Sequence, residues 1–486
     1  MTKTAFSVLD FGADPTGVDD STKAFVEASD RARKAHLALK VLHGLDCPES
    51  KWGELPPGAW LQPRQDATRV LVADNDLAIE PPDAGAPLAT VLVPEGTYRL
   101  QPSSPGTTGI TWHSIHWIGE ASHGEARTVL KPVSPEPPDD DQDDSGESDT
   151  LEDGVAAGTA AGAPVTALIR TTGRVTLQDI AIDCDNEIDA GLILVDAIGA
   201  RLRHVSVQNA RKVGVSISEA EWLRAERLSA SVCPIGISVY NSNGASFIDL
   251  RAIDCGIGIE VRGSEDTKSS AILSMQGISI EVHKKTKRDK DSPMFLVDRV
   301  QGGTFGFNYL HGGRVGIRVS GKSRSATFTG GGAPVGQSLS YHGQYNQVND
   351  LSSDQEHPYF IDLENAHHCT FIGFAPASGI VRVNADRSAQ NQFVGLGHSQ
   401  GSKKFGNMPI AFYSNQISKP WIAYERDGRL QAFGPPPDQV GWWPTGQVIE
   451  NIDPDYDRPM GWVFRRPNGR WLALPTITRP APEPES

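Results

Sequence analysis

The chain has 486 residues, a net charge of −15 and abundant glycine (49) and proline (34). A chain of this length can bury a large core, and so many glycines and prolines are typical of a fold with many turns. It contains no run of 18 apolar residues, which excludes a membrane-spanning helix, and no basic stripe of the kind that binds nucleic acid. We therefore expect neither membrane insertion nor a nucleic-acid partner.

The N-terminal segment predicts a capping helix. Residues 6–25 read FSVLDFGADPTGVDDSTKAF, and the residue types that cap helices occur at 19–21. Apolar residues then recur at helical spacing, at Ala24, Phe25, Ala28 and Ala32. Such a helix would cover the open end of a stack of strands, whose free edges invite aggregation. The preceding MTKTAFSVLDFG has no apolar stretch, so we recognise no secretory signal.

Residues 33–89 are irregular, and the strand pattern returns in TVLVPEGTYRL (90–100). Residues 134–153 hold ten acidic residues and no basic one, which predicts a solvated loop. Part of this run also matches the spacing of a calcium loop, in Asp141, Asp143, Ser145, Gly146, Asp149 and Glu152. Because the preceding SPEPPDD cannot be a helix, we expect no cofactor and keep calcium as the alternative.

A repeat dominates the middle of the chain. Gly191, Gly214, Gly236 and Gly258 recur at spacings of 23, 22 and 22 residues, and each opens a short run in which apolar residues alternate. Alternation is the period of a strand, and a repeat of this size indicates stacked coils. The sequence therefore predicts an all-β fold, a single-stranded parallel β-helix, over roughly residues 90–420.

The same pattern continues at 294–299, 316–321, 359–365, 379–385 and 409–415. In each run two residues should point outward, and successive coils should align these residues in ladders about 4.8 Å apart. The expected outward pairs are Ile193/Val195, Ser216/Ser218, Ser238/Tyr240, Glu260/Arg262, Leu296/Asp298, Arg318/Ser320, Asp362/Glu364 and Arg382/Asn384.

Residues 421–486 differ from the repeat. Five of the ten tryptophans lie there, with turn signals such as RPNGR, so we predict a small antiparallel β module and a disordered tail. The predicted domains are thus 1–89 with the capping helix, 90–420 as the β-helix with its acidic insertion at 134–153, and 421–486.

The motif FSVLDFGADPTGVDDSTKAF resembles the N-terminal motif of pectate-lyase-like right-handed β-helix proteins, and TVLVPEGTYRL looks like the first-coil strand that follows it. The C-terminal PTGQVIENIDPDYDRPMGWVFRRPNGRWLALP is similar to a module of phage and bacterial members. The group includes polygalacturonase-type hydrolases, polysaccharide lyases and phage tailspike depolymerases. The resemblance implies a right-handed helix, a homotrimer, and a location in a virion tail or outside the cell. The sequence has no polygalacturonase-like pattern of paired aspartates with a nearby Gly-His.

The polar middle of the outward face is the candidate active site, and its catalytic candidates are Tyr240, Glu260, Arg262, Asp298 and Arg318. A hydrolase needs two carboxyl groups, for which Glu260 and Asp298 are suitably placed. A lyase acting on a uronate needs a cation and a base, which Arg262 or Arg318 and Tyr240 would supply. Sequence leaves both reactions open.

Further residues are expected to bind the substrate. The insertion 281–293 (EVHKKTKRDKDSP) would place a basic loop beside the same face, which favours an anionic polymer. The substrate-binding candidates are Ser238, His283, Lys284, Lys285, Asp362, Glu364 and Arg382, and Asp362 with Glu364 is also a second possible hydrolase site. We expect a polysaccharide lyase or endo-glycosidase that acts on a long acidic bacterial or algal polysaccharide. A non-catalytic adhesin or structural tail protein and a uronan epimerase are the alternatives.

Overall fold

The computed structural model describes residues 5–42, 46–47, 69–70, 89–103, 112, 115–122, 125–133, 165–264, 273–283, 292–311, 315–330, 359–374, 380–396, 409–417, 420–426, 429–437, 447–452, 458–465 and 470–476. The chain divides into two compact units. Unit 1 comprises Met1–Ile193 and Val205–Lys212, and unit 2 comprises Leu194–His204 and Val213–Ser486. This division falls inside two strands, β13 (Ala190–Val195) and β14 (Arg201–Gln208). The domain bounds expected from the sequence stay a prediction.

Unit 1 consists of parallel strands, one long helix and two small antiparallel pairs. Parallel pairing links β1 (Ala5–Ser7), β5 (Thr90–Leu92), β7 (His116–Ile118) and β12 (Thr176–Asp183), in that order. It also links β2 (Thr16–Asp20), β6 (Gly96–Leu100), β10 (Thr128–Pro132) and β12. The other elements are η1 (Val8–Phe11), α1 (Thr22–Leu42), β3 (Asp46–Cys47), β4 (Arg69–Val70), β8 (Ala121–Ser122), β9 (Glu125–Ala126) and β11 (Ala167–Thr172).

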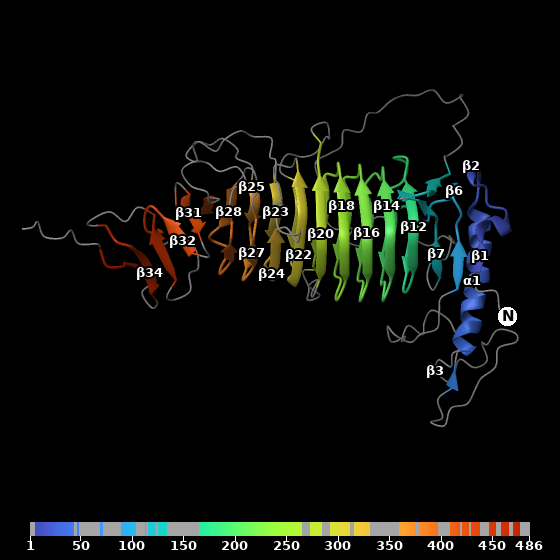
Figure 1. The fold of residues 1–486 in the computed structure, drawn as a ribbon, viewed down its shortest axis with the longest axis horizontal. Coiled ribbons are helices and arrows are strands. Elements are labelled where there is room, and N and C mark those ends of the chain that lie inside the picture. Colours follow the sequence, from blue (N-terminus) through green and yellow to red (C-terminus); the bar gives the residue numbers. More distant parts are fainter. Residues whose placement is uncertain are drawn as a thin grey trace, which may run out of the picture. The chain divides into compact units, whose positions relative to one another are not determined.

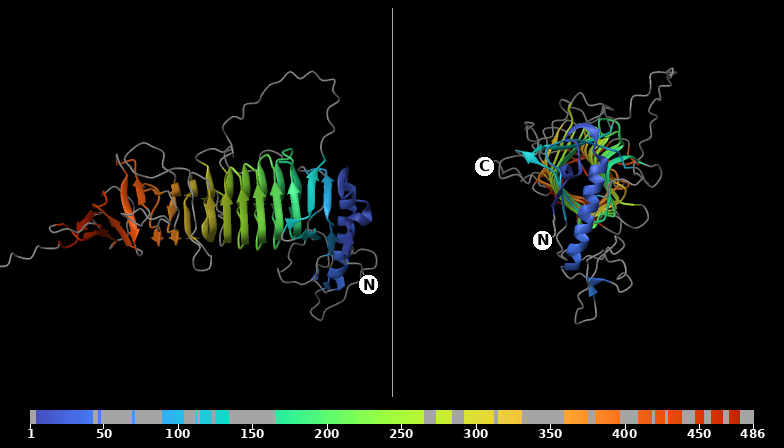
Figure 2. Two further views of the ribbon diagram at one scale, coloured as in Figure 1. Left: turned by 45° about the horizontal axis from the view of Figure 1, so that its top comes forward. Right: turned by 90° about the vertical axis from the view of Figure 1, so that its right-hand side faces the viewer.

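Helix α1 is the expected capping helix. It begins at Thr22, whose backbone N–H donates to the Asp20 carboxylate at 2.8 Å, and it contacts β1 and β5 (Figure 2). Its buried side is the predicted one, with Ala24, Phe25, Ala28 and Ala32 at most 5% exposed. The Phe25 ring packs against Tyr98, Trp112 and Trp117 at centroid distances of 5.5, 6.3 and 5.9 Å. This aromatic cluster attaches the helix to the first coils.

Unit 2 is built from coils, and each coil contributes one strand to each of two parallel sheets (Figure 1). The first sheet runs through β15 (Val213–Ser218), β17 (Ile235–Tyr240), β19 (Ile257–Arg262), β21 (Pro293–Asp298), β23 (Val315–Ser320), β25 (Tyr359–Leu363), β28 (Ile380–Asn384) and β30 (Pro409–Tyr413). The second runs through β16 (Arg224–Ser231), β18 (Ser246–Ile253), β20 (Ser274–Glu281), β22 (Gln301–His311), β24 (Ser323–Gly330), β27 (Thr370–Ile372) and β29 (Gln392–Val394), with β26 (Ala366–His367) also beside β24. The expected right-handed parallel β-helix is confirmed.

The repeated glycines have a steric cause. A Cβ on Gly236 would lie 2.4 Å from the carbonyl oxygen of Gly258 on the next coil, and a Cβ on Gly214 would lie 2.7 Å from that of Gly236. Any side chain here would push neighbouring coils apart. The period seen in the sequence is therefore the period of a close backbone contact.

The interior contains a stack of phenylalanines, one from each of several coils. Phe328 and Phe371 stack at 4.7 Å between ring centroids, and Phe305 and Phe393 extend the row at 5.1 and 5.6 Å. Cys184, Cys233, Cys255 and Cys369 are buried and fill similar interior positions. Among the described helices, none is long and apolar enough to cross a membrane.

The C-terminal strands continue the first sheet with a change of direction. β31 (Trp421–Arg426) pairs antiparallel with β30, and antiparallel pairs also join β31 to β32 (Arg429–Ala432), β33 (Val448–Asn451) to β34 (Gly461–Arg465), and β34 to β35 (Arg470–Ala473). β32 and β33 are parallel, so the expected β module is present but is not wholly antiparallel.

The glycine contact predicts a large effect of a small substitution. Gly236→Ala should lower the free energy of unfolding by about 1–3 kcal/mol, because the added methyl group overpacks the coil interface. Gly434→Ala is the matched control, since no atom lies within 4 Å of the Cβ it would add. Urea unfolding of both variants tests this prediction, and equal losses of stability would contradict it.

The buried Tyr98 phenol predicts a loss of stability at alkaline pH. Burial, aided by the charges of Glu120 and Asp14, raises the pKa of Tyr98 to about 12, against about 10 for an unfolded tyrosine. Since the folded pKa is the higher one, this contribution to stability is complete below about pH 10 and is lost as the pH rises through about 12. Urea unfolding measures the stability of both proteins at about pH 9 and about pH 11. Between these two pH values, Tyr98→Phe should lose less stability than the unchanged protein. An identical loss in both proteins would show that other groups cause it.

Candidate active site

The candidate site lies on the outer face of the first sheet of unit 2. We call this surface the ladder face, and define it by the outward residues of β17, β19, β21, β23, β25 and β28. Strand register places Ser238 beside Glu260, Glu260 beside Leu296, Leu296 beside Arg318, Arg318 beside Asp362, and Asp362 beside Arg382. The coils are therefore aligned as the spacing of the repeats predicts.

Glu260 is the centre of a first polar group. Although it occupies an outward position, it is only 2% exposed. Its carboxylate accepts hydrogen bonds from Ser238 Oγ at 2.7 Å and from Arg262 Nε at 2.9 Å. Two neighbours on the ladder thus satisfy this carboxylate, and a substrate has little access to it.

Tyr240 and Asp298 flank Arg262 on either side. Register places Tyr240 beside Arg262 on the preceding coil and Asp298 beside it on the following coil. Asp298 accepts a hydrogen bond from Ser320 Oγ at 3.1 Å and forms an ion pair with Arg299 Nη1 at 3.2 Å. Three of the predicted catalytic residues therefore occupy one row across three coils.

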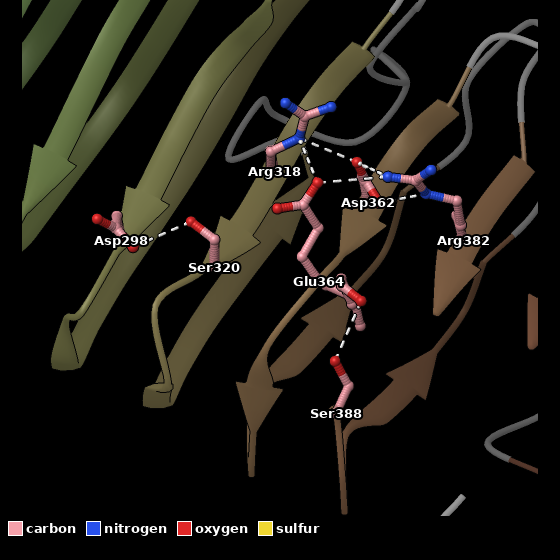
Figure 3. A network of polar contacts seen from close by, with 8 residues as sticks. Asp298, Arg318, Ser320, Asp362, Glu364, Arg382 and Ser388 are labelled. Carbon is pink, nitrogen blue, oxygen red and sulfur yellow. Dashed lines mark hydrogen bonds and ion pairs between the residues drawn. The ribbon is translucent and has the colours of Figure 1, made fainter. Parts of the chain in front are cut away.

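A second polar group surrounds Asp362, which is fully buried (Figure 3). Arg318 Nε donates to its carboxylate at 2.9 Å, while Arg382 Nε and Nη2 both donate at 2.7 Å. Glu364 joins from the exposed side, with its Oε1 3.4 Å from both Arg318 Nε and Arg382 Nη2. Two carboxylates and two guanidinium groups from three coils thus form one compact network.

The structure divides the predicted catalytic set. Arg318 belongs to the Asp362 network, and Leu296 separates it from Glu260 in the ladder. Of the predicted binding residues, Asp362 and Glu364 contact Arg318 directly, and Arg382 is joined to it through these two carboxylates. Ser238, Tyr240, Glu260, Arg262 and Asp298 form the other group.

Two tyrosines of the second group were not among the sequence candidates. The guanidinium carbon of Arg382 lies 4.5 Å from the centre of the Tyr359 ring, a cation–π contact. Tyr413 follows Asn384 in the ladder; burial, with a contribution from Tyr359, raises the pKa of its phenol. Burial disfavours the charged form of Arg382, but the hydrogen bonds of its guanidinium group to Asp362 have the larger effect and raise the pKa of Arg382. Continuing the register by one further coil would have found Tyr413.

Charges on the ladder face are arranged in depth. Asp362 is fully buried beneath Arg318 and Arg382, whose side chains are 20% and 30% exposed. Arg262 likewise covers Glu260, and Arg299 is more exposed than Asp298. The carboxylates lie below and the guanidinium groups above them. Glu364 differs, since 42% of its side chain is exposed.

The remaining predicted site residues lie elsewhere. His283 Nδ1 contacts the carboxylate of Asp254 at 2.8 Å. Lys284 and Lys285 lie outside the described residues, as do all members of the possible calcium loop, Asp141, Asp143, Ser145, Asp149 and Glu152. Within the described part of the chain, no group of three or more His, Cys, Asp or Glu side chains is placed to hold a metal ion.

Comparison with known proteins finds similar structures but no matching sequence family. No family model matches the chain, and no curated protein does. The chain is similar to ORF18 of Geobacillus virus E2, at 12% identity and a TM-score of 0.49, over 98% of this chain and 86% of that one. It is also similar to the A-module of the mannuronan C-5 epimerase AlgE6 of Azotobacter vinelandii, at 12% identity and a TM-score of 0.38, over 82% of this chain and 100% of the module.

A third similar structure is the enzymatically active domain of tailspike protein 2 of bacteriophage CBA120. Identity is 10% and the TM-score 0.41, over 81% of this chain and 46% of the tailspike chain. Confirmation of the fold comes from the parallel coils of this chain themselves, because likeness at such identity concerns the fold alone.

The Asp362 network predicts unequal roles for its two carboxylates. Asp362→Asn should lower the free energy of unfolding by about 3 kcal/mol, because it leaves two half-buried guanidinium groups without their buried counter-charge. Glu364→Gln should cost less than about 1 kcal/mol, because Glu364 is half-exposed. Urea unfolding of both variants measures the difference. Equal losses would mean that burial does not set the strength of these contacts.

Proposed function

We propose that the ladder face binds a long acidic polysaccharide and that the protein cleaves it. The observation that carries this proposal is the layering of charge, in which guanidinium groups cover buried carboxylates. The face thereby offers arginines in a fixed geometry, and a guanidinium group suits bidentate recognition of a sugar carboxylate. The coil repeat presents such groups along an axis, as a polymer of similar units requires.

Arg318 is the best-placed group to bind a sugar carboxylate. Only its Nε contacts Asp362 and Glu364, and Figure 3 shows its two terminal nitrogens pointing away from both. The carboxylates below hold the side chain in place, so little side-chain entropy remains to be lost on binding. Arg382, with its hydrogen bonds to Asp362, would provide the second contact.

Cleavage by hydrolysis is supported by the positions of Glu364, whose side chain is 42% exposed, and Asp298, whose side chain is 12% exposed. Glu364 and Asp298 lie two coils apart with Ser320 between them, as Figure 3 shows. Two strand spacings are roughly 10 Å, close to the range in which an inverting glycosidase places its carboxyl groups on either side of a sugar and a water. Since Glu260 is buried, we propose Glu364 in its place as the partner of Asp298.

β-Elimination is the second candidate reaction, favoured by the position of Tyr240 beside Arg262. The cation would neutralise a uronate carboxylate, and Tyr240 as a phenolate would take the proton from C5. A C4=C5 double bond would form as the C4–O bond breaks, and the phenol would return the proton to the leaving oxygen. Binding without cleavage is the third candidate, because Glu260 and Asp362 are satisfied by arginine and serine and closed to solvent. An epimerase would use the lyase residues without breaking the chain. A homotrimer in a virion tail or outside the cell, with no cofactor, stays part of this proposal.

An assay on a panel of acidic bacterial and algal polysaccharides tests the proposal. Reducing ends and the ultraviolet absorbance of unsaturated sugars are followed together, and proton NMR detects epimerisation. Reducing ends alone indicate hydrolysis, whereas both signals indicate elimination. For hydrolysis, Glu364→Gln should lower kcat at least about 100-fold, with Glu187→Gln as an exposed control.

Each negative result has a definite meaning. Binding to one polysaccharide without any product would replace cleavage by glycan binding alone. Neither binding nor product on any acidic polymer would overturn the proposal. If Glu364→Gln is fully active and Tyr240→Phe is inactive, the reaction takes place at Tyr240 and Arg262 instead of at Glu364.

A further inference from the structure

A second charged surface lies on the other sheet of unit 2, on the outer side of β14, β16 and β18, which lie side by side (Figure 1). The fourth residue of each strand has a positive φ, 51° at His204, 54° at Arg227 and 61° at Asp249. A left-handed residue inside a strand makes a bend at which two consecutive side chains face outward. Glu226 and Arg227 are both exposed, as are Ile248 and Asp249.

The bend concentrates arginine on this surface. We call it the basic face and define it by its exposed charged residues. These are Arg201, Arg203, Arg224, Glu226, Arg227, Asp249 and Arg251. The basic face therefore has five arginines and two carboxylates of its own, with Glu281 beside Arg251 at its edge, although the whole chain carries a net charge of −15. All seven belong to unit 2.

The arginines of the basic face are held more loosely than those of the ladder face. Arg203 and Arg227 lie 3.8 Å from the carboxylates of Glu226 and Asp249, and Arg251 lies 3.5 Å from that of Glu281. Arg227 Nη1 also contacts His204 Nε2 on the neighbouring strand. Each of these three arginines is more than half exposed. Exposed ion pairs with such long distances between nitrogen and oxygen contribute little to the stability of the fold. Folding stability alone therefore does not account for the excess of arginine on this face.

An exposed aromatic ring adjoins the basic face. Trp222 lies two residues before β16 and is 60% exposed. Its φ of 56° is unusual for a bulky residue, and its ring lies against Gly244, where a Cβ would come within 3.0 Å of it. A flat ring fixed on a glycine and open to solvent is suited to stack against a sugar ring.

We propose that the basic face with Trp222 is a second, non-catalytic binding surface for an acidic polysaccharide. The arginines would bind the acid groups, and Trp222 would stack on one sugar. The proposal shares the class of polymer with the proposed function of the ladder face, but it concerns binding alone and does not require cleavage. A polymer held here would keep the protein on its substrate while the ladder face acts.

The test is a binding measurement on the full chain carrying Glu364→Gln, so that cleavage does not shorten the probe. Fluorescently labelled alginate and polygalacturonate are the acidic probes, and dextran is the neutral one. Arg224→Gln with Arg227→Gln should weaken binding to an acidic probe by on the order of tenfold at low salt and reduce its salt dependence. Trp222→Ala should weaken it by roughly fivefold or more.

Matched controls come from the C-terminal strands. Arg429→Gln removes an exposed arginine, and Phe433→Ala removes an aromatic ring about as exposed as Trp222, so both should leave the affinity unchanged. In protein with Glu364 intact, the basic-face variants should retain any cleavage of short oligosaccharides. If the protein without these substitutions cleaves no polymer, while the basic-face substitutions still weaken binding, the result contradicts the proposed function only.

Two results would overturn the inference. The first is an unchanged affinity in the variant that lacks Arg224, Arg227 and Trp222. The second is binding of single-stranded DNA of equal charge as tightly as the polyuronates and with the same sensitivity to these substitutions. That result would make the surface a general polyanion site instead of one for acidic sugars.

Discussion

The backbone hydrogen bonds between successive coils are the constraint on which the rest of the structure depends. They hold each residue beside its equivalent one coil away, so interior and exterior become rows of aligned positions. The consequences differ with the residue. Glycines allow close backbone approach, phenylalanines stack, and outward charges meet the charges of neighbouring coils. Each row therefore repeats one kind of contact between neighbouring coils along the helix axis.

Much of the fold could be predicted because the repeat is visible in the sequence. Gly214, Gly236 and Gly258 revealed the coil, and alternation within each run separated inward from outward residues. Ala24, Phe25, Ala28 and Ala32 similarly revealed the buried side of α1. These features depend on short-range periodicity, which a single sequence records directly. The parallel pair of β32 and β33 depends on contacts between distant segments, and no local pattern encodes it.

The candidate site was predicted less completely, since register gives neighbours but not side-chain depth. Spacing placed Glu260, Arg262 and Asp298 on adjacent coils, and the structure agrees. It did not indicate that Glu260 and Asp362 would be buried beneath arginines, or that Arg318 would bind Asp362 and not Glu260. The apolar residue Leu296 lies between Glu260 and Arg318 in the ladder and so separates the two polar groups.

The alternation of charge around Asp362 also limits how this helix can change in length. Repeat proteins gain and lose coils by duplication and deletion, and a coil can be removed if its two neighbours fit each other. Removal of the coil that carries Asp362 would bring Arg318 against Arg382, and duplication of it would place two buried aspartates side by side. Both outcomes set like charges about 4.8 Å apart in the ladder. In this part of the chain, the order of charges therefore opposes the gain or loss of a single coil.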